Sequence, residues 1–393
     1  MSYFSEFVGG SAPVGSIVQG PYNLTDIAYL PCDGRKVVRA TYPLLSACLS
    51  SVGTFTGTSR TKPVTCVTAA ICTHGLNYVM SGIAGGSGGI LTTPDGITFT
   101  QRTTPAGTTV VSLISDGTNI VGAANGASPV YSTDGGSTFT ASTGSSTTTL
   151  SQTAMAHAPT LGANGRFCIA TAGSTQVSTS DDRGLNWTLR THGLGYIVFH
   201  VCWTGTKYIA TLNTAGYIGV SVDGITWTLQ AMPFRTSAST AIAGGIVSDG
   251  AGKVLWVDAG AFLLYTSSDY GVTWSKRMYG VVSNGANSGL MVLYMPSFAN
   301  GRFFISVSVV AAGCSFLTSA DLQSWAPVLD AYSPSMSSNY NVMAHKSGVY
   351  FFNDATTTAC QTLVEDTTKM YLPNNSQSEV GSSNNFLPFI KVQ

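Results

Sequence analysis

A short box recurs along most of the chain and constrains the fold more than any other sequence feature. In its full form the box reads Ser-x-Asp-x-Gly-x-x-aromatic, as in residues 132–139. Two copies are one residue shorter, and the last copy has lost its glycine. The aspartates of the six copies are Asp95, Asp134, Asp182, Asp223, Asp269 and Asp321.

The spacing of the boxes predicts a ring of repeated sheets. Successive box aspartates are 39 to 52 residues apart, close to the period of a four-stranded propeller blade. A polar turn followed by an apolar strand precedes several boxes, for example at 164–167 and 300–303, and it recurs at 346–352 without a box. Counting that unit favours seven blades over six. Since a single sheet cannot bury both its faces, whereas a closed ring of sheets can, we expect an all-β fold, a β-propeller.

The residues of the box suit a hairpin turn. Asp accepts hydrogen bonds from backbone N–H groups, and Gly allows a positive φ. The aromatic residue at the end of the box is expected to pack between neighbouring sheets. We therefore expect structural roles for the six aspartates, with calcium ligation as the alternative, and for the tryptophans that end four copies, Trp187, Trp227, Trp274 and Trp325.

These residues resemble the Asp-box (BNR) repeat of sialidases, some glycoside hydrolases and non-catalytic propellers. The resemblance covers about residues 63–373. It implies that the boxes lie on the periphery of the blades, away from the ligand face. On that basis the boxes indicate the fold and carry no catalysis.

The segment before the first blade shows a different pattern. A Pro-x-Gly-Ser-Ile strand at 13–18 is followed by a Cys-Asp-Gly turn at 32–34 and by an apolar helical spacing at 42–49. In this order the three elements resemble the phage tail collar domain, and Met370-Tyr371-Leu372-Pro373 resembles a later strand of that family.

The two resemblances together predict the domain organisation. We expect a tail-collar-like domain at 1–60, the Asp-box propeller at 61–368, and a C-terminal segment at 369–393 that completes the collar-like domain. The propeller would then be an insertion, which is tolerated because a closed ring brings its first and last strands together. A short independent C-terminal tail is the alternative.

A search for catalytic or metal-binding patterns finds none. A sialidase needs an arginine cluster, and Arg235 comes closest to the required setting without matching it. Among the acidic residues outside the boxes, Asp116 and Asp249 belong to turns, while Asp258 lies in a strand from which it could reach a channel. The histidines show no metal spacing. We therefore expect no catalytic residue, no metal and no cofactor, and a protein that is not an enzyme.

Composition excludes several partners. The 18 basic and 18 acidic residues balance, and only 9% of residues are charged, so no long-range field attracts nucleic acid or anionic lipid. The N-terminus shows no recognisable signal peptide. The chain contains no uncharged apolar segment of 18 residues, which argues against a membrane-spanning helix. The eight cysteines are scattered without paired spacing, so we expect free thiols and not disulfides for Cys32, Cys48, Cys66, Cys72, Cys168, Cys202, Cys314 and Cys360.

The collar-like resemblance implies a bacteriophage tail fibre or a baseplate-attached protein, made in the host cytoplasm and carried in the virion. Its expected partners are other tail or baseplate proteins and a host cell-surface receptor, either glycan or protein. The binding residues are unknown, although turn-proximal tyrosines are suited to such a surface: Tyr196, Tyr217, Tyr270 and Tyr279. A purely architectural tail protein and an envelope-glycan depolymerase are the alternatives, and a homo-oligomer remains open.

Overall fold

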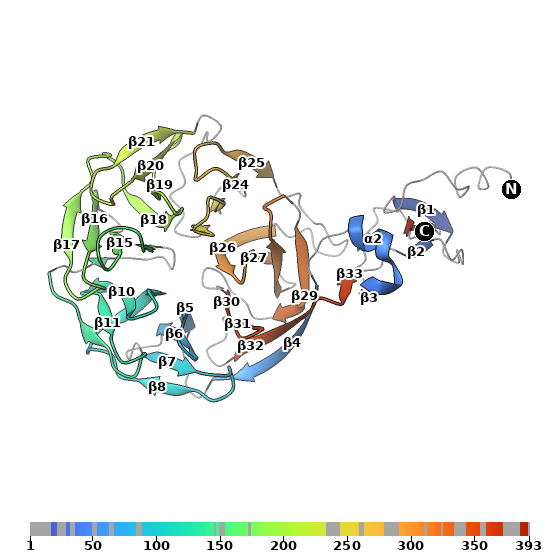
Figure 1. Cartoon of the computed structure of the whole chain (residues 1–393), viewed down its shortest axis with the longest axis horizontal. Coiled ribbons are helices and arrows are strands. Elements are labelled where there is room, and N and C mark those ends of the chain that lie inside the picture. Colours follow the sequence, from blue (N-terminus) through green and yellow to red (C-terminus); the bar gives the residue numbers. More distant parts are fainter. Residues whose placement is uncertain are drawn as a thin grey trace.

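The computed structural model is a ring of seven β-sheets with a small unit at one side (Figure 1). It describes residues 17–21, 29–31, 36–48, 53–62, 67–83, 89–144, 147–148, 154–171, 174–232, 244–258, 263–278, 291–309, 313–323, 325–333, 343–353, 359–371 and 386–391. The prediction of an all-β, seven-bladed propeller is confirmed. Within the described residues, no helix has the length and apolar character needed to cross a membrane.

Each sheet is antiparallel and runs from an inner strand at the channel to an outer strand at the periphery. The blades are, in chain order: β5 (Val67–His74), β6 (Asn77–Ile83), β7 (Ile90–Thr93) and β8 (Thr100–Arg102); β9 (Thr109–Ser115), β10 (Ile120–Ala127), β11 (Val130–Ser132) and β12 (Thr140–Ala141), with β13 (Thr147–Thr148) also on β10; β14 (Met155–Ala158), β15 (Arg166–Ala170), β16 (Gln176–Ser180) and β17 (Thr188–Thr191); β18 (Val198–Trp203), β19 (Tyr208–Leu212), β20 (Tyr217–Ser221) and β21 (Thr228–Ala231); β22 (Gly244–Ser248), β23 (Val254–Asp258), β24 (Leu263–Ser267) and β25 (Ser275–Met278); β26 (Met291–Ala299), β27 (Arg302–Val309), β28 (Gly313–Ser319) and β29 (Ala326–Ser333); β30 (Met343–Lys346), β31 (Val349–Asn353), β32 (Ala359–Asp366) and β4 (Thr54–Thr61).

The seventh blade closes the ring with a strand from the other end of the propeller. Its outer strand, β4, pairs with β32 along its whole length, from Thr54 opposite Asp366 to Thr61 opposite Ala359. The domain boundary expected at residue 60 falls inside this strand, so the propeller sheet begins at Thr54. After β32 the chain leaves the ring, and an earlier segment therefore supplies the fourth strand.

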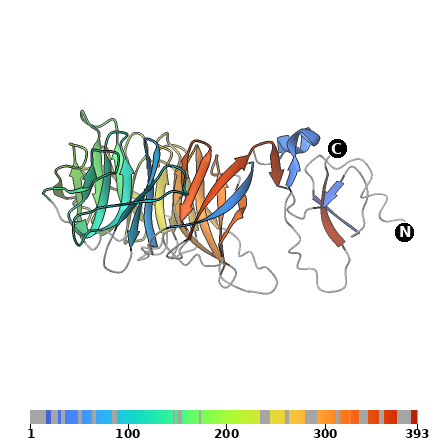
Figure 2. The ribbon, with the colours of Figure 1, turned by 90° about the horizontal axis from the view of Figure 1, so that it is seen from below.

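The small unit, here called the end unit, is built from both ends of the chain. β34 (Phe386–Lys391) lies between β1 (Ile17–Pro21) and β2 (Tyr29–Pro31), antiparallel to both. β3 (Lys36–Val38) pairs with β33 (Lys369–Tyr371), next to the turn η1 (Arg39–Thr41) and the helix α2 (Pro43–Cys48). The end unit stands beside the ring in both ribbon views (Figures 1 and 2). The expected Asp33-Gly34 turn and Leu372-Pro373 lie outside the described residues.

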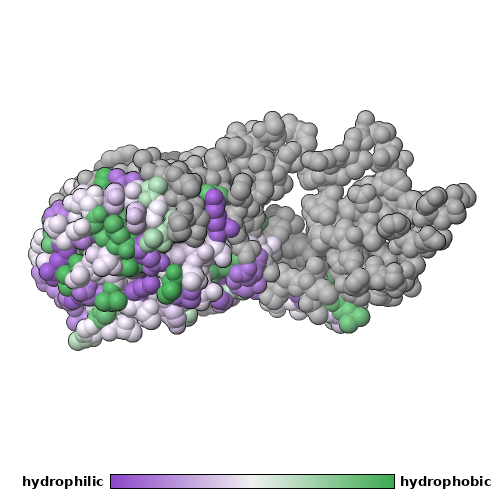
Figure 3. Space-filling view, turned by 90° about the horizontal axis from the view of Figure 1, so that it is seen from above, coloured by the Kyte–Doolittle hydropathy of each residue, from purple (hydrophilic) through white to green (hydrophobic). Residues whose placement is uncertain are grey.

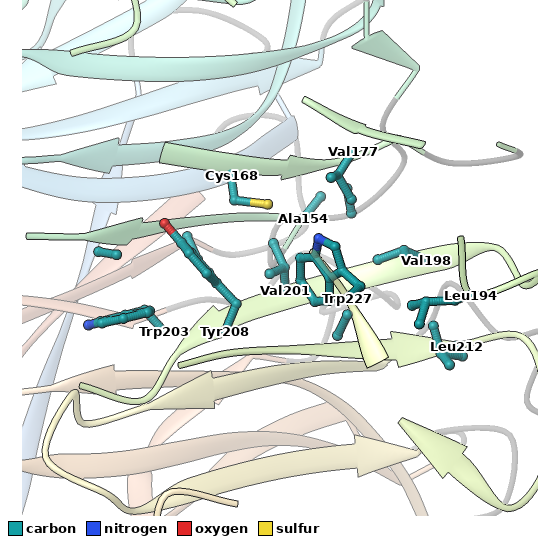
Figure 4. Packing of buried hydrophobic residues seen from close by; sticks show 14 residues of the cluster. Ala154, Cys168, Val177, Leu194, Val198, Val201, Trp203, Tyr208, Leu212 and Trp227 are labelled. Atoms are coloured by element: carbon teal, nitrogen blue, oxygen red, sulfur yellow. The ribbon is translucent and has the colours of Figure 1, made fainter. Parts of the chain in front are cut away.

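Buried side chains hold neighbouring blades together. Each of the seven interfaces between blades contains a cluster of buried apolar residues, including the interface between the seventh blade and the first. Figure 4 shows the cluster between the third and fourth blades, to which both blades contribute side chains: Ala154 and Val177 from the third, Val201 and Trp227 from the fourth. Because apolar burial is the main favourable term in folding, these interfaces stabilise the ring.

The box turns lie between the third and fourth strands of the first six blades. In the fourth blade, Asp223 accepts hydrogen bonds from the N–H groups of Ile225 and Thr226 at 2.8 Å each, and Ser221 donates to its carboxylate at 2.9 Å. The indole of Trp227 donates to the carbonyl of Gly224 at 3.1 Å and is 6% exposed. The box thus forms a hydrogen-bonded hairpin that ends in a buried ring.

The sixth box shows what replaces the missing glycine. Leu322 occupies the glycine position and keeps the left-handed backbone, with φ of 63°. This conformation is unfavourable for a residue with a side chain. Its side chain is 1% exposed and belongs to the apolar cluster between the fifth and sixth blades, so burial offsets the strain.

Candidate functional site: a funnel in the central channel

The candidate site is a cavity of about 670 Å³ in the central channel of the propeller. The inner strands β5, β9, β14, β18, β22, β26 and β30, one from each blade, all contribute to it. We call it the funnel, and its lining is Ile71, Leu113, Ile114, Ser115, Met155, Ala156, His157, Pro159, Thr160, Val201, Cys202, Trp203, Gly205, Ile246, Val247, Ser248, Asp249, Gly250, Pro296, Ser297, Phe298 and Met343.

The floor of the funnel is a ring of apolar side chains. Each inner strand provides one residue at the same register position. This residue lies three positions before the last residue of the inner strand that pairs with the second strand, as Ile71 lies three positions before His74, which pairs with Asn77. We call this set the apolar ring: Ile71, Leu113, Met155, Val201, Ile246, Pro296 and Met343. Ile71 is half-buried, and the other six are buried. These seven residues form the deepest level of the described lining.

The wall above the apolar ring mixes aromatic and small polar residues. Two positions nearer the hairpins lie Ser115, His157, Trp203, Ser248 and Phe298. The imidazole of His157 stacks on Phe167 at 4.3 Å between ring centroids, and Trp203 packs edge-on against Tyr208 at 4.8 Å. The aromatic side chains of the wall are therefore held in place by the second strands of their blades.

The rim is formed by the hairpin turns after the inner strands. Pro159 and Thr160 are exposed there, beside Gly205 and Gly250. Gly205 needs to be glycine because its φ is +106° and a Cβ would lie 2.3 Å from the carbonyl oxygen of Gly250. The close approach of these two turns narrows the rim between the fourth and fifth blades.

Four polar groups of the lining are engaged in hydrogen bonds within the propeller. The Ser248 hydroxyl donates to the carbonyl of Lys253 at 2.8 Å and accepts the N–H of Gly250 at 3.1 Å. The carboxylate of Asp249 accepts the N–H groups of Ala251 and Lys253 at 2.8 and 2.9 Å. Two further hydroxyls are likewise occupied, that of Ser115 by Gly117 N–H and His74, and that of Ser297 by Met343 N–H.

Burial keeps the titratable groups of the wall neutral. Desolvation lowers the pKa of His157, so its imidazole is uncharged at pH 7. Desolvation raises the pKa of the Cys202 thiol, which is therefore protonated. No Lys or Arg occurs among the lining residues that the structure describes. Asp249 is the acidic residue of this lining.

The acidic residues weighed from the sequence lie elsewhere or in turns. Asp258 is 2% exposed at the end of β23 and does not line the funnel. Asp116 accepts the N–H groups of Thr118 and Asn119, as a turn residue does. Arg235 lies outside the described residues.

The histidines, cysteines and tyrosines are distributed through the propeller. His192 and His200 are buried, His74 contacts Ser115, and His345 packs on Tyr350. In the part of the chain that the structure describes, no group of three or more His, Cys, Asp or Glu side chains is placed to hold a metal ion. Cys72, Cys168, Cys202 and Cys360 are free thiols.

Three of the four tyrosines singled out from the sequence can be placed. Tyr217 and Tyr270 are 41% and 39% exposed, Tyr196 is partly buried, and Tyr279 lies outside the described residues. Figure 3 shows one side of the propeller, on which apolar and polar residues are interspersed. Isolated apolar residues of this kind are normal on a protein surface, so the coloured residues of this side form no apolar patch that would mark a site.

The box aspartates behave as turn anchors. Hydrogen bonds from the N–H groups of Thr98 and Ile97 hold the pKa of Asp95 below its usual value. Burial acts to raise the pKa of Asp134, but hydrogen bonds from Thr138 and Ser132 outweigh it and lower the pKa to about 2. The six aspartates do not line the funnel.

Sequence reasoning missed the funnel. The residues of the apolar ring are ordinary apolar strand residues, and none stands out in its own segment. The available signal is their common register, which appears only when the seven inner strands are aligned on their hairpins.

Known structures share the propeller fold with this chain. A streptogramin B lyase matches with a TM-score of 0.59 and 14% identity, over 79% of this chain and 98% of that one. YCF48 from Cyanidioschyzon merolae matches with a TM-score of 0.53 and 16% identity, over 79% and 98%. A GH74 xyloglucanase from Xanthomonas campestris matches with a TM-score of 0.52 and 14% identity, over 77% of this chain and 44% of that one. No protein-family model and no curated protein matches the chain.

These similarities correct one expectation. The prediction that the protein is not an enzyme is wrong as an exclusion, because two of these similar propellers are enzymes, a lyase and a xyloglucanase. The prediction rested on the lack of recognisable catalytic motifs. A propeller builds its sites from side chains on separate blades, and such a site leaves no local motif in the sequence.

Proposed function

We propose that the chain is a bacteriophage tail protein in which the end unit docks to the tail or baseplate and the propeller binds a receptor on the host cell. The docking half of this proposal comes from the collar-like motifs at 13–49. The binding half comes from the funnel, a cavity of about 670 Å³ that residues from all seven blades line.

The observation that carries the proposal is the position of β34 in the end unit. This strand, at 386–391, lies between β1 and β2 from the beginning of the chain. A collar-like unit interrupted by an inserted propeller would have this topology. The arrangement also separates the two tasks, because the end unit and the propeller are different sheets joined near Thr54 and Asp366.

The test compares the full chain with a chain truncated after Asn385, which lacks β34. We expect labelled full chain to bind saturably to receptor-bearing bacteria and to join tail particles. The truncated chain should still bind the cells, because the propeller strands are intact, but should fail to join the particles. Sugars released from the cells are assayed in the same tubes.

Each outcome separates the proposal from its alternatives. Incorporation into particles without any binding to cells would favour an architectural tail protein. Binding accompanied by released sugar would assign a depolymerase activity to the propeller. Equal incorporation of the truncated and full chains would contradict docking through the end unit.

A further inference from the structure

We propose that the funnel binds an uncharged, mainly apolar group of its ligand, an aryl ring or a short alkyl chain. This inference rests on the proposed receptor-binding function and names the chemistry of the group recognised. It follows from the floor, the wall and the charge of the funnel.

The floor offers apolar contact from every blade. The apolar ring gives the lining one apolar residue from each of seven separate strands. A group that reaches the floor meets apolar residues from every blade, and transfer of apolar surface from water into such an environment is favourable.

The wall offers little to a charged or strongly polar group. The hydroxyls of Ser115 and Ser248 already hydrogen-bond within their turns, and that of Ser297 accepts the N–H of Met343 on the next blade. No Lys or Arg occurs in the described lining, and Asp249 is held by two backbone N–H groups. A carboxylate or phosphate entering the funnel would lose its hydration without gaining a counter-charge.

The size of the funnel fits a small group with a polar extension. A cavity of about 670 Å³ lies within the usual range for small-molecule sites. An aryl or alkyl group can reach the apolar ring while a sugar attached to it stays at the rim beside Pro159 and Thr160. The ligand is thus expected to be apolar at one end and hydrated at the other.

The probes for the test share one sugar scaffold. Phenyl β-glucoside carries a neutral aryl group, octyl β-glucoside below its micelle concentration carries a neutral alkyl chain, and phenyl β-glucuronide adds a negative charge. Binding to the full chain is measured by titration calorimetry. We expect one site for a neutral glucoside, with a dissociation constant at least about tenfold lower than for the glucuronide.

Two matched variants locate the binding. Thr160→Trp places a large ring at the exposed rim of the funnel, whereas Thr188→Trp makes the same change on the outer strand β17 of the same blade, at an exposed position outside the lining. We expect Thr160→Trp to raise the dissociation constant at least about tenfold and Thr188→Trp to leave it unchanged.

The outcomes distinguish this inference from the proposed function. Equal affinity for the glucuronide, no effect of Thr160→Trp, or no binding of any probe at millimolar concentration would each overturn the inference. If the chain nevertheless adheres to cells, the receptor-binding proposal stands without it. If a neutral probe binds in the funnel and cells are not bound, the proposed function fails and the ligand chemistry stands.

Discussion

The six blades with a box and the seventh blade without one obtain their fourth strand in different ways. In the boxed blades, a hairpin carries the chain from the third strand to the fourth, and the aspartate of the box holds that turn. In the seventh blade the third strand, β32, ends at Asp366 and the chain leaves for β33. The fourth strand is β4, so no hairpin exists there to need a box.

The contact between blades is nevertheless kept. In the third blade, Arg166 donates to the carbonyl of Asp223 in the next box at 2.8 Å, and Lys253 of the fifth blade donates to that of Ala320 at 2.8 Å. Arg302 occupies the same place in the sixth blade and instead pairs with Glu365 at 2.8 Å. Glu365 also accepts the N–H of Gly53 at 2.7 Å. The comparison shows that the box stabilises its own hairpin, whereas the cation at the start of the second strand contacts the neighbouring blade.

The largest effect is expected from Glu365→Ala. The side chains of Arg302 and Glu365 are 14% and 9% exposed, so removing the carboxylate leaves a buried cation and an unpaired N–H. We expect a loss of about 3 kcal/mol in the free energy of unfolding, measured in urea. The matched control is Asp181→Ala, which removes the exposed partner of Arg166 and should cost at most about 1 kcal/mol. Equal losses in the two variants would contradict the special role of the seventh blade.

The next effect tests whether the boxed blades and the seventh blade unfold together. Burial lowers the pKa of His200, in the fourth blade, to about 3. The folded state therefore keeps His200 neutral while the unfolded chain takes up a proton below pH 6.5, so stability is full above pH 6.5 and falls as the pH drops toward 3.

Between pH 6.5 and 5 this loss is on the order of 2 kcal/mol. Melting temperatures of the wild type and His200→Gln across this range measure it, and the variant should show the shallower slope. The same slope in the wild type and in Glu365→Ala would indicate one cooperative ring. A flat profile for Glu365→Ala would show that the seventh blade opens separately.

The smallest effect concerns a single box. Asp223→Ala removes an acceptor from two backbone N–H groups of the fourth box, with no change in the buried Trp227. Because water partly replaces the lost hydrogen bonds, we expect a loss of about 1 kcal/mol in urea unfolding. A loss as large as that of Glu365→Ala would mean that the box does more than hold its own hairpin.

The propeller could be predicted because each box combines local turn chemistry with a long spacing. Asp, Gly and a terminal aromatic residue form a recognisable motif within one segment, and six such motifs at blade spacing indicate a ring of blades. The role of β4 could not be predicted in the same way. Nothing in 54–61 indicates which sheet it joins, because its partner lies some 300 residues away and strand pairing is decided by the closed ring.

The funnel and the Arg302–Glu365 pair were equally hidden from sequence reasoning. The members of the apolar ring become neighbours only through a shared register, and Glu365 becomes a partner of Arg302 only through the contact between the sixth and seventh blades. From the sequence, Asp258 is the acidic residue expected to reach the channel. It is the last residue of β23, the second strand of its blade, and it is not part of the funnel lining.

The pairing of β4 with β32 has a mechanical consequence. Both connections to the end unit leave from one end of this strand pair, at Thr54 and at Asp366. A pull transmitted through the end unit therefore draws the two strands in the same direction and does not peel one from the other. The force is transmitted from β4 and β32 to the rest of the seventh blade and to its neighbours. The strand pair that closes the ring is therefore also the place where the propeller can be pulled without separating that pair.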